Sequence, residues 1–262
     1  MQSVNYNSLL TLAYQLLCRD MRERYTGTLF GWCWLLFNPL FMLAIYSFIF
    51  GEVLQLRFGS AVTANSHFAF YLFAGLLVFN GLSEVMTRTS SVLQDRRDML
   101  LNTPLSPWLL AVLPVITSVL LEWLALLVLL LAMGLWGEFK PLGLLYYLPF
   151  CLARVVLSLA LAFMITPVAV FFRDLRQLMP AVLTVLLFIS PILYPPEVIP
   201  ERFLGWYDWN LLSHLVAGYR AALLEGILDT TLLLILLPVA ALSLLLAVLA
   251  FRSLMPRARY VL

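Results

Sequence analysis

Three ionisable side chains lie within strongly apolar stretches of the sequence: Glu84, Glu122 and Arg154. A charge near the middle of a bilayer costs about 2.5–3.5 kcal/mol on insertion scales, so each needs a partner, water or a nearby interface. Glu84 is close to the end of its stretch, where an interfacial position is available. Glu122 and Arg154 lie deeper, in neighbouring stretches, and we expect them to pair. A structural ion pair and a hydrophilic lining are both open interpretations, whereas a proton relay would need more carboxylates.

Motifs for catalysis and for nucleotide or metal binding are missing from the sequence. Lys140, the sole lysine, stands in GEFKP, so the P-loop pattern GxxxxGK[ST] cannot occur. There is no GxSxG, no HExxH and no CxxC, and no residues have a metal-ligand spacing. We therefore predict no catalytic residue, metal or cofactor in this chain. Transport driven by ATP would need a separate polypeptide to bind ATP and Mg²⁺.

The composition indicates a membrane protein. Hydrophobic residues make up 63% of the chain and charged residues 11%, against about 45–50% and about 25% in soluble domains. So much apolar surface cannot be hidden in one globule of this size, and lipid must cover the rest. A net charge of +2 is too small to suggest a nucleic-acid partner. The predicted fold class is an all-α integral membrane protein.

Six apolar stretches are long enough to be transmembrane helices, each needing about 20 residues. They are 30–51, 68–87, 108–134, 142–172, 178–195 and 232–251. Eleven basic residues fall on one side of this arrangement and four on the other, and the basic side is cytoplasmic. We therefore expect cytoplasmic N- and C-termini, with residues 1–29 as an interface segment and residues 30–262 as the transmembrane domain.

Two segments outside these spans have their own pattern. Residues 6–26 form an amphipathic helix in projection, either a simple interfacial anchor or a lever that connects a cytoplasmic partner to the first span. Residues 196–231 contain an apolar stretch too short and too polar to span. We predict a pair of short re-entrant helices there; an ordinary surface loop with an interfacial helix is the alternative. The residues assigned to an outer gate are Pro195, Pro196, Trp206, Tyr219 and Arg220.

Aromatic side chains follow one face of each of the first two spans. Such faces hold sugar rings through their apolar C–H surfaces without binding tightly, which suits a conduit that must release each unit. Most aromatic stripes in membrane helices instead pack against neighbours or lipid. The residues predicted to line a substrate channel are Trp34, Phe37, Phe41, Phe48, Tyr71 and Phe79.

Three segments together resemble a known family. CRDMRERYTGTLFGWCWLLFNPLFMLAIYSFIFG (18–51) looks like the opening of the type-2 ABC transporter permeases that export polysaccharides. FFRDLRQLMPAVLTVLLFISPILYPPEVIP (171–200) resembles their fourth cytoplasmic turn, fifth span and proline-rich exit. WNLLSHLVAGYRAALLEG (209–226) is similar to the motif before their last span. The order of the three segments is the same as in the family.

The resemblance implies a pathway formed by two copies of the chain, with two separate nucleotide-binding ATPase subunits below. It implies a location in the bacterial inner membrane, and a lipid-linked polysaccharide, most simply O-antigen, as cargo. A short cytoplasmic segment, QDRRDMLLNTP (94–104), would dock into the ATPase, and the N-terminal helix would make a second contact. The implied docking residues are Arg19, Arg22, Arg24, Tyr25, Arg96, Arg97, Asp98, Met99, Leu100 and Asn102.

Two other functions stay open at this point. LLNTPLSPWLLAVLP (100–114) looks more like drug-exporting relatives, so a drug or lipid is the alternative cargo. A membrane enzyme acting on a polyprenyl carrier would place acidic residues in cytoplasmic loops. The acids there are mainly Asp95, Asp98 and Asp174, each beside an arginine, which favours docking over chemistry.

Overall fold

The computed structural model describes residues 6–27, 29–49, 68–102, 106–196, 199–200, 202 and 204–258. All regular elements in these residues are helices, which confirms the all-α prediction. Their bounds are α1 Tyr6–Tyr25, a 3₁₀ turn Gly31–Cys33, α2 Trp34–Tyr46, α3 Phe68–Thr89, α4 Val92–Asp95, α5 Arg97–Asn102, α6 Pro107–Leu135, α7 Pro141–Phe171, α8 Leu175–Ile189, α9 Leu204–Trp209, α10 Leu211–Arg220, a π-helical turn η5 Ala221–Glu225 and α11 Thr230–Ala258.

Five of the helical segments are long and apolar enough to cross a membrane. They are Gly31–Ile49, which includes α2, then α3, α6, α7 and α11. The remaining predicted span, 178–195, corresponds to α8, which has 15 residues and ends at Ile189. Because a straight span needs about 20 residues, the count of six spans stays a prediction. The last two residues of the first predicted span lie outside the described residues.

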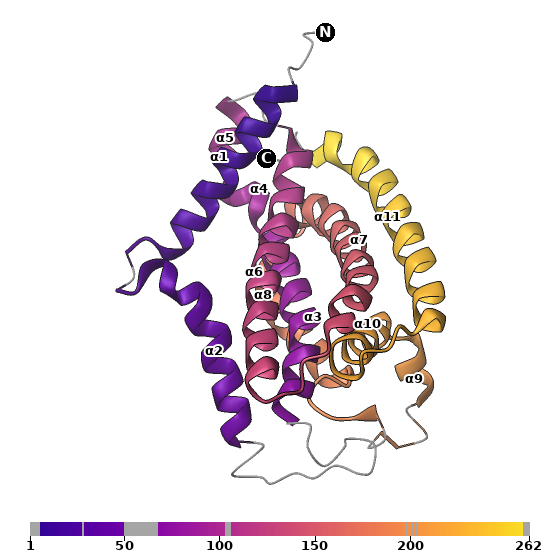
Figure 1. Cartoon of the computed structure of the whole chain (residues 1–262). Helices are drawn as coiled ribbons and strands as arrows, with labels where there is room; N and C mark the ends of the chain where they lie inside the picture. Colours follow the sequence, from indigo (N-terminus) through magenta and orange to yellow (C-terminus); the bar gives the residue numbers. More distant parts are fainter. Residues whose placement is uncertain are drawn as a thin grey trace.

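Helices α3, α6 and α7 form the centre of the bundle, and α11 packs along α7 (Figure 1). The start of α1, the short helices α4 and α5 and the end of α11 lie toward one end of the bundle, called here the α1 end (Figure 1). Helices α9 and α10 lie at the opposite end, called the α10 end. This placement of the first and last helices at one end agrees with an even number of crossings.

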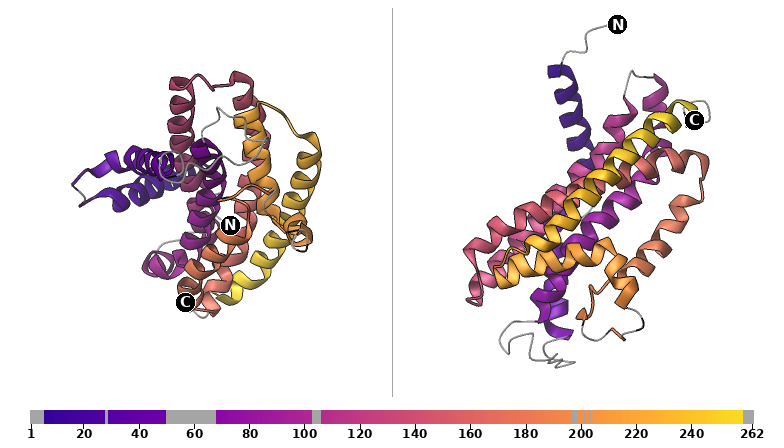
Figure 2. Two further views of the ribbon diagram at one scale, coloured as in Figure 1. Left: turned by 90° about the horizontal axis from the view of Figure 1, so that it is seen from below. Right: turned by 90° about the vertical axis from the view of Figure 1, so that its right-hand side faces the viewer.

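Helices α2 and α8 lie at the edges of the bundle (Figure 2). In each of them a single described residue is buried, Leu43 in α2 and Met179 in α8. Many of their other apolar side chains are exposed, including Phe41 and Phe188, at 57% and 61%. In a membrane protein such faces meet lipid or another membrane helix.

Helix α10 is inserted into the bundle rather than lying on its surface. Seven of its ten residues are buried, and it packs against α3 and α7. A Cβ atom on Gly218 would lie 2.3 Å from the Phe150 ring of α7, so only glycine allows this approach. The chain then turns at Gly226, whose φ of +68° is unfavourable for residues with a side chain, and enters α11. The burial of α10 argues against the alternative of an ordinary surface loop, and the re-entrant pair stays a prediction.

We expect Gly143→Ala to destabilise the bundle. Its new Cβ would lie 2.5 Å from the carbonyl oxygen of Ala222, so α7 and η5 would have to separate. Overpacking of this kind costs about 1–3 kcal/mol, which would appear as a lower Tm in detergent. Gly134→Ala in α6 is the matched control because nothing lies within 4 Å of its Cβ. Equal Tm values for the two variants would contradict this packing.

Candidate functional site

The most deeply buried charges are Glu122 on α6 and Arg154 on α7, and they form the expected ion pair. Both side chains are fully buried. Two tyrosine hydroxyls donate hydrogen bonds to Oε1 of Glu122: Tyr147 of α7 at 2.8 Å and Tyr219 of α10 at 2.5 Å. One carboxylate thus joins three helices in a region that bulk water does not reach.

The guanidinium of Arg154 makes further contacts on its other side. Nη1 donates to the hydroxyl of Ser118 at 2.9 Å and to that of Ser158 at 3.4 Å. A Cβ on Gly81 of α3 would lie 3.1 Å from Cζ, so this glycine leaves room for the guanidinium. The sequence indicated the ion pair, but the tyrosine, serine and glycine partners have no recognisable pattern along the chain.

Arg220, at the end of α10, binds backbone carbonyls at the α10 end of the bundle. Its Nη1 and Nη2 donate to the carbonyls of Pro191 and Ile192, each at 2.8 Å, and Nε donates to that of Tyr71 at 3.1 Å. The guanidinium also lies 3.5 Å from the centroid of the Tyr71 ring, a cation–π contact. Arg220 therefore ties α10 to α3 and to the segment that follows α8.

The predicted outer-gate residues occupy different environments. Tyr219 and Arg220 are buried and bound to other helices, as described above. Pro195 is buried and Pro196 is half-buried, just after α8. The side chain of Trp206 lies outside the described residues. Gating by this set stays a prediction.

The predicted channel residues separate into two groups. Trp34, Phe37, Phe41 and Phe48 on the first span are exposed, at 38%, 53%, 57% and 62%. The rings of Trp34, Phe37 and Phe41 are in contact, with centroids 5.7 Å apart for the first pair and 6.3 Å apart for the second. On α3, by contrast, Tyr71 holds Arg220 and Phe79 packs against the core. The exposed stripe is free to line a pathway, and this role stays a prediction for both groups.

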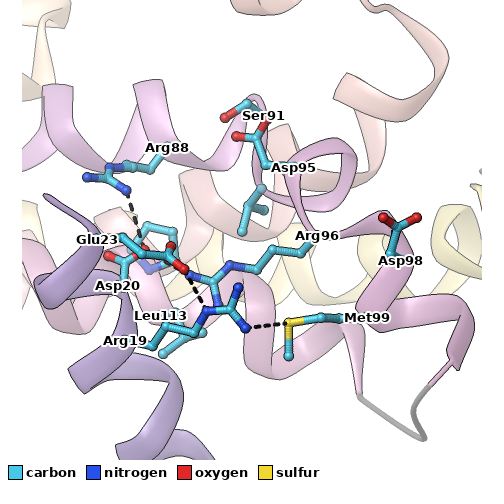
Figure 3. Close-up of a pocket in the computed structure, with 12 residues that line it drawn as sticks. Arg19, Asp20, Glu23, Arg88, Ser91, Asp95, Arg96, Asp98, Met99 and Leu113 are labelled. Carbon is cyan, nitrogen blue, oxygen red and sulfur yellow. Dashed lines mark hydrogen bonds and ion pairs between the residues drawn. The ribbon is translucent and has the colours of Figure 1, made fainter. Parts of the chain in front are cut away.

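A network of ion pairs connects α1 to the end of α3 and to α4–α5 at the α1 end (Figure 3). Asp20 of α1 accepts hydrogen bonds from Arg96 Nη2 at 2.9 Å and from Arg88 Nη1 at 3.4 Å. Glu84 accepts one from Arg88 Nε at 3.0 Å and also pairs with Arg24 of α1. Glu84 is thus part of the same network as the arginines of α1, as its position near the end of a span suggested.

A cavity of about 260 Å³ lies between α1 and α4–α5 (Figure 3). Arg19 bridges its wall: Nε donates to Glu23 at 2.6 Å, and Nη1 lies 3.9 Å from the sulfur of Met99. Asp20, the acid that connects these elements, is not among the predicted docking residues. The signal was present, because Asp20 lies four residues after Leu16 and four before Arg24, so both charges stand on the face of α1 that packs against the bundle.

The predicted docking residues are partly used inside the subunit. Arg24 and Arg96 are engaged in the ion-pair network, and Met99 and Leu100 are half-buried. Arg22, Arg97 and Asp98 are exposed at the α1 end. The side chains of Tyr25 and Asn102 lie outside the described residues. Within the described part of the chain, no group of three or more His, Cys, Asp and Glu side chains could hold a metal ion.

A family comparison matches this arrangement over most of the chain. The model of the ABC-2 type transporter family covers residues 11–224, from α1 through α10 to η5. The chain belongs to the ABC-2 type transporter family. It is accordingly a multi-pass membrane permease and not an enzyme, and permeases of this family work with ATPase subunits.

Curated relatives of this ABC-2 permease align over most of their own length. An O-antigen export system permease protein of Myxococcus xanthus is 27% identical over 217 residues, covering 82% of this chain and 80% of the relative. A protein of the same description from Klebsiella pneumoniae is 23% identical over 230 residues, covering 86% and 85%. A polysialic acid transport protein of Escherichia coli is 24% identical over 212 residues, covering 80% of each.

We expect Arg154→Met to destabilise the permease strongly because it leaves Glu122 buried without its counter-ion. Breaking a buried pair from one side costs about 3–5 kcal/mol, measurable as a lower Tm in detergent. The double variant Glu122→Gln/Arg154→Met removes both charges and should recover much of that loss. As the control, Arg176→Met breaks the exposed pair with Asp95, whose side chains are 58% and 50% exposed, and should cost less than about 1 kcal/mol. A double variant no more stable than Arg154→Met would contradict this interpretation.

Proposed function

We propose that the chain is the permease subunit of an ABC exporter that moves a lipid-linked polysaccharide, most simply O-antigen, across the bacterial inner membrane. The observation that carries the proposal is the similarity, over 80% or more of both chains, to permeases described as exporting O-antigen or transporting polysialic acid. Both cargoes are polysaccharides. ATP, with Mg²⁺, would be bound and hydrolysed by a separate ATPase subunit.

A second copy of the chain is part of this proposal. Helices α2 and α8 present apolar faces at the edges of the bundle, and α2 has an exposed aromatic stripe. Two chains meeting through these edges would place both stripes along a shared pathway. Aromatic faces bind sugar C–H surfaces weakly, which suits a polymer that must move on after each contact.

The α1 end is the proposed site of ATPase docking, with both termini on the cytoplasmic side. Exposed Arg22, Arg97 and Asp98 offer charges to a partner. Asp20 links α1 to Arg96, which lies between α4 and α5, and to Arg88 at the end of α3. A displacement of α5 by the ATPase would therefore be transmitted to α1 and to the membrane helix α3.

Deleting the gene should abolish export of the polysaccharide, because no other subunit would form the pathway. The measurement is the amount of surface glycan, compared with glycan that accumulates inside the cell, and a plasmid copy should restore export. Normal surface glycan in the deletion strain, or a change in drug resistance alone, would overturn the assignment and favour a drug or lipid cargo.

We expect Arg97→Glu to weaken docking, because it reverses an exposed charge on α5 without breaking an ion pair among the described residues. Co-purification of the ATPase with the permease in detergent should fall, and surface glycan should fall with it. Arg173→Glu is the control: Arg173 is also an exposed arginine, between α7 and α8, and is outside the predicted docking set. Equal retention of the ATPase by both variants would argue against docking through α5.

A further inference from the structure

A groove of about 280 Å³ lies between three membrane helices of a single subunit. Helix α2 contributes Trp34, Asn38 and Met42, which are spaced four residues apart and so lie on one face. The facing surfaces of α3 and α6 complete the walls, and Arg24 of α1 lies at one end. The residues from these two helices are Phe73, Leu76, Leu77, Asn80, Gly81, Ser83 and Glu84 from α3, and Ser118, Leu121, Glu122 and Ala125 from α6.

Two amide side chains line this groove and have no hydrogen bond to any residue that the structure describes. Asn38 lies within the apolar segment Gly31–Ile49, and Asn80 lies near the middle of α3. Both are exposed. A polar group at membrane depth is costly unless it meets water or a polar ligand. Polar residues in spans usually face a bundle interior or a hydrated cavity and mark a substrate pathway.

Polar residues recur along the groove, between apolar side chains such as Leu76, Leu77 and Leu121. The Arg24–Glu84 ion pair stands at the α1 end, and Glu122 and Ser118 stand at the inner end. Asn38, Asn80 and Ser83 lie between them. This gives the groove both donors and acceptors on facing helices, beside the exposed ring of Trp34.

We propose that this groove binds a single sugar unit of the cargo, with Asn38 and Asn80 donating to and accepting from its hydroxyls and Trp34 packing against its C–H face. The inference rests on the proposed function and adds a binding site to it. A polyhydroxylated sugar ring can use all of these groups at once, because its hydroxyls bind the amides and the Ser83 hydroxyl while its C–H face packs on Trp34. The groove volume of about 280 Å³ is close to the smallest small-molecule sites, at about 300 Å³. It therefore suits one sugar ring rather than a polymer.

Other occupants fit the groove less well. A lipid tail would leave both amides without hydrogen bonds, each at a cost. A second copy of the chain is not required to form the walls, because all three helices belong to one subunit. The groove is thus distinct from the exposed stripe of Phe37, Phe41 and Phe48, none of which lines it. That stripe remains available to the partner copy.

Cysteine accessibility in cells tests the occupant directly. Asn38→Cys and Asn80→Cys are made in a chain whose native Cys18, Cys33 and Cys151 are replaced by serine, and are expressed with the ATPase. The probe is a charged, water-soluble methanethiosulfonate, applied to permeabilised cells with or without glycan synthesis. Leu127→Cys is the matched control, since Leu127 on α6 is 49% exposed and does not line the groove.

We expect both groove cysteines to react in cells that make no glycan, and to react several-fold more slowly in cells that do. The Leu127→Cys control should stay unreactive in both because lipid covers it. Equal reaction rates with and without glycan would overturn the proposal. Absence of reaction in both strains would also overturn it, because it would mean that lipid or the second copy fills the groove. A disulfide between two copies of Asn38→Cys or Asn80→Cys would identify the second copy.

Leucine variants give an independent readout. Asn38→Leu and Asn80→Leu keep the helices apolar, and each should slow glycan export by about fivefold, the factor expected for one neutral hydrogen bond. ATPase activity of the purified complex without cargo should be unchanged. Unchanged export in both variants would overturn the sugar site while leaving the exporter assignment intact, because that assignment is tested separately by loss of surface glycan on deletion.

Discussion

The ion pair between Glu122 and Arg154 is the interaction on which the bundle depends. Lipid and protein interior are similarly apolar, so burial alone does not specify how membrane helices pack. A buried charge pair does specify it, because any arrangement that separates the two charges leaves them unsatisfied in a medium without water. The carboxylate of Glu122 also accepts hydrogen bonds from the hydroxyls of Tyr147 and Tyr219, so the same group positions α6, α7 and α10.

Polar clusters at the two ends of the bundle share one helix, α3. At the α10 end, Arg220 binds the Tyr71 carbonyl and stacks on its ring. At the α1 end, Glu84 and Arg88 join α3 to α1. A rigid helix of 22 residues thus separates the inserted helix α10 from the segment proposed to meet the ATPase. The α10 end and the α1 end of the bundle are therefore connected through a single helix, α3.

The aromatic residues show how the same residue type serves two purposes in membrane helices. On α2 the rings of Phe37 and Phe41 face outward at the edge of the bundle. On α3 the rings of Tyr71 and Phe79 hold helices together. The difference arises from the position of each helix, since α3 is central and α2 is at the edge (Figure 2). Helical projection places rings on one face but does not say what that face meets.

Much of this protein was determined by the sequence alone. Hydropathy located the long membrane helices, and the positions of Leu9, Leu12 and Leu16 against Thr11 and Arg22 indicated the amphipathic α1. The missing P-loop indicated that transport driven by ATP would need a separate ATPase. The depth of Glu122 and Arg154 indicated their pairing, because an apolar environment forces such charges together. These conclusions depend only on composition and local spacing.

Only the tertiary structure decided which partners lie together across the bundle. It placed Tyr219 and Arg220 in the interior, connected Asp20 to Arg96, and brought Asn38 and Asn80 to one groove. No spacing rule predicts these contacts, because they join residues of different helices. Hydropathy cannot separate a side chain that faces lipid from one that faces another helix, since both surroundings are apolar.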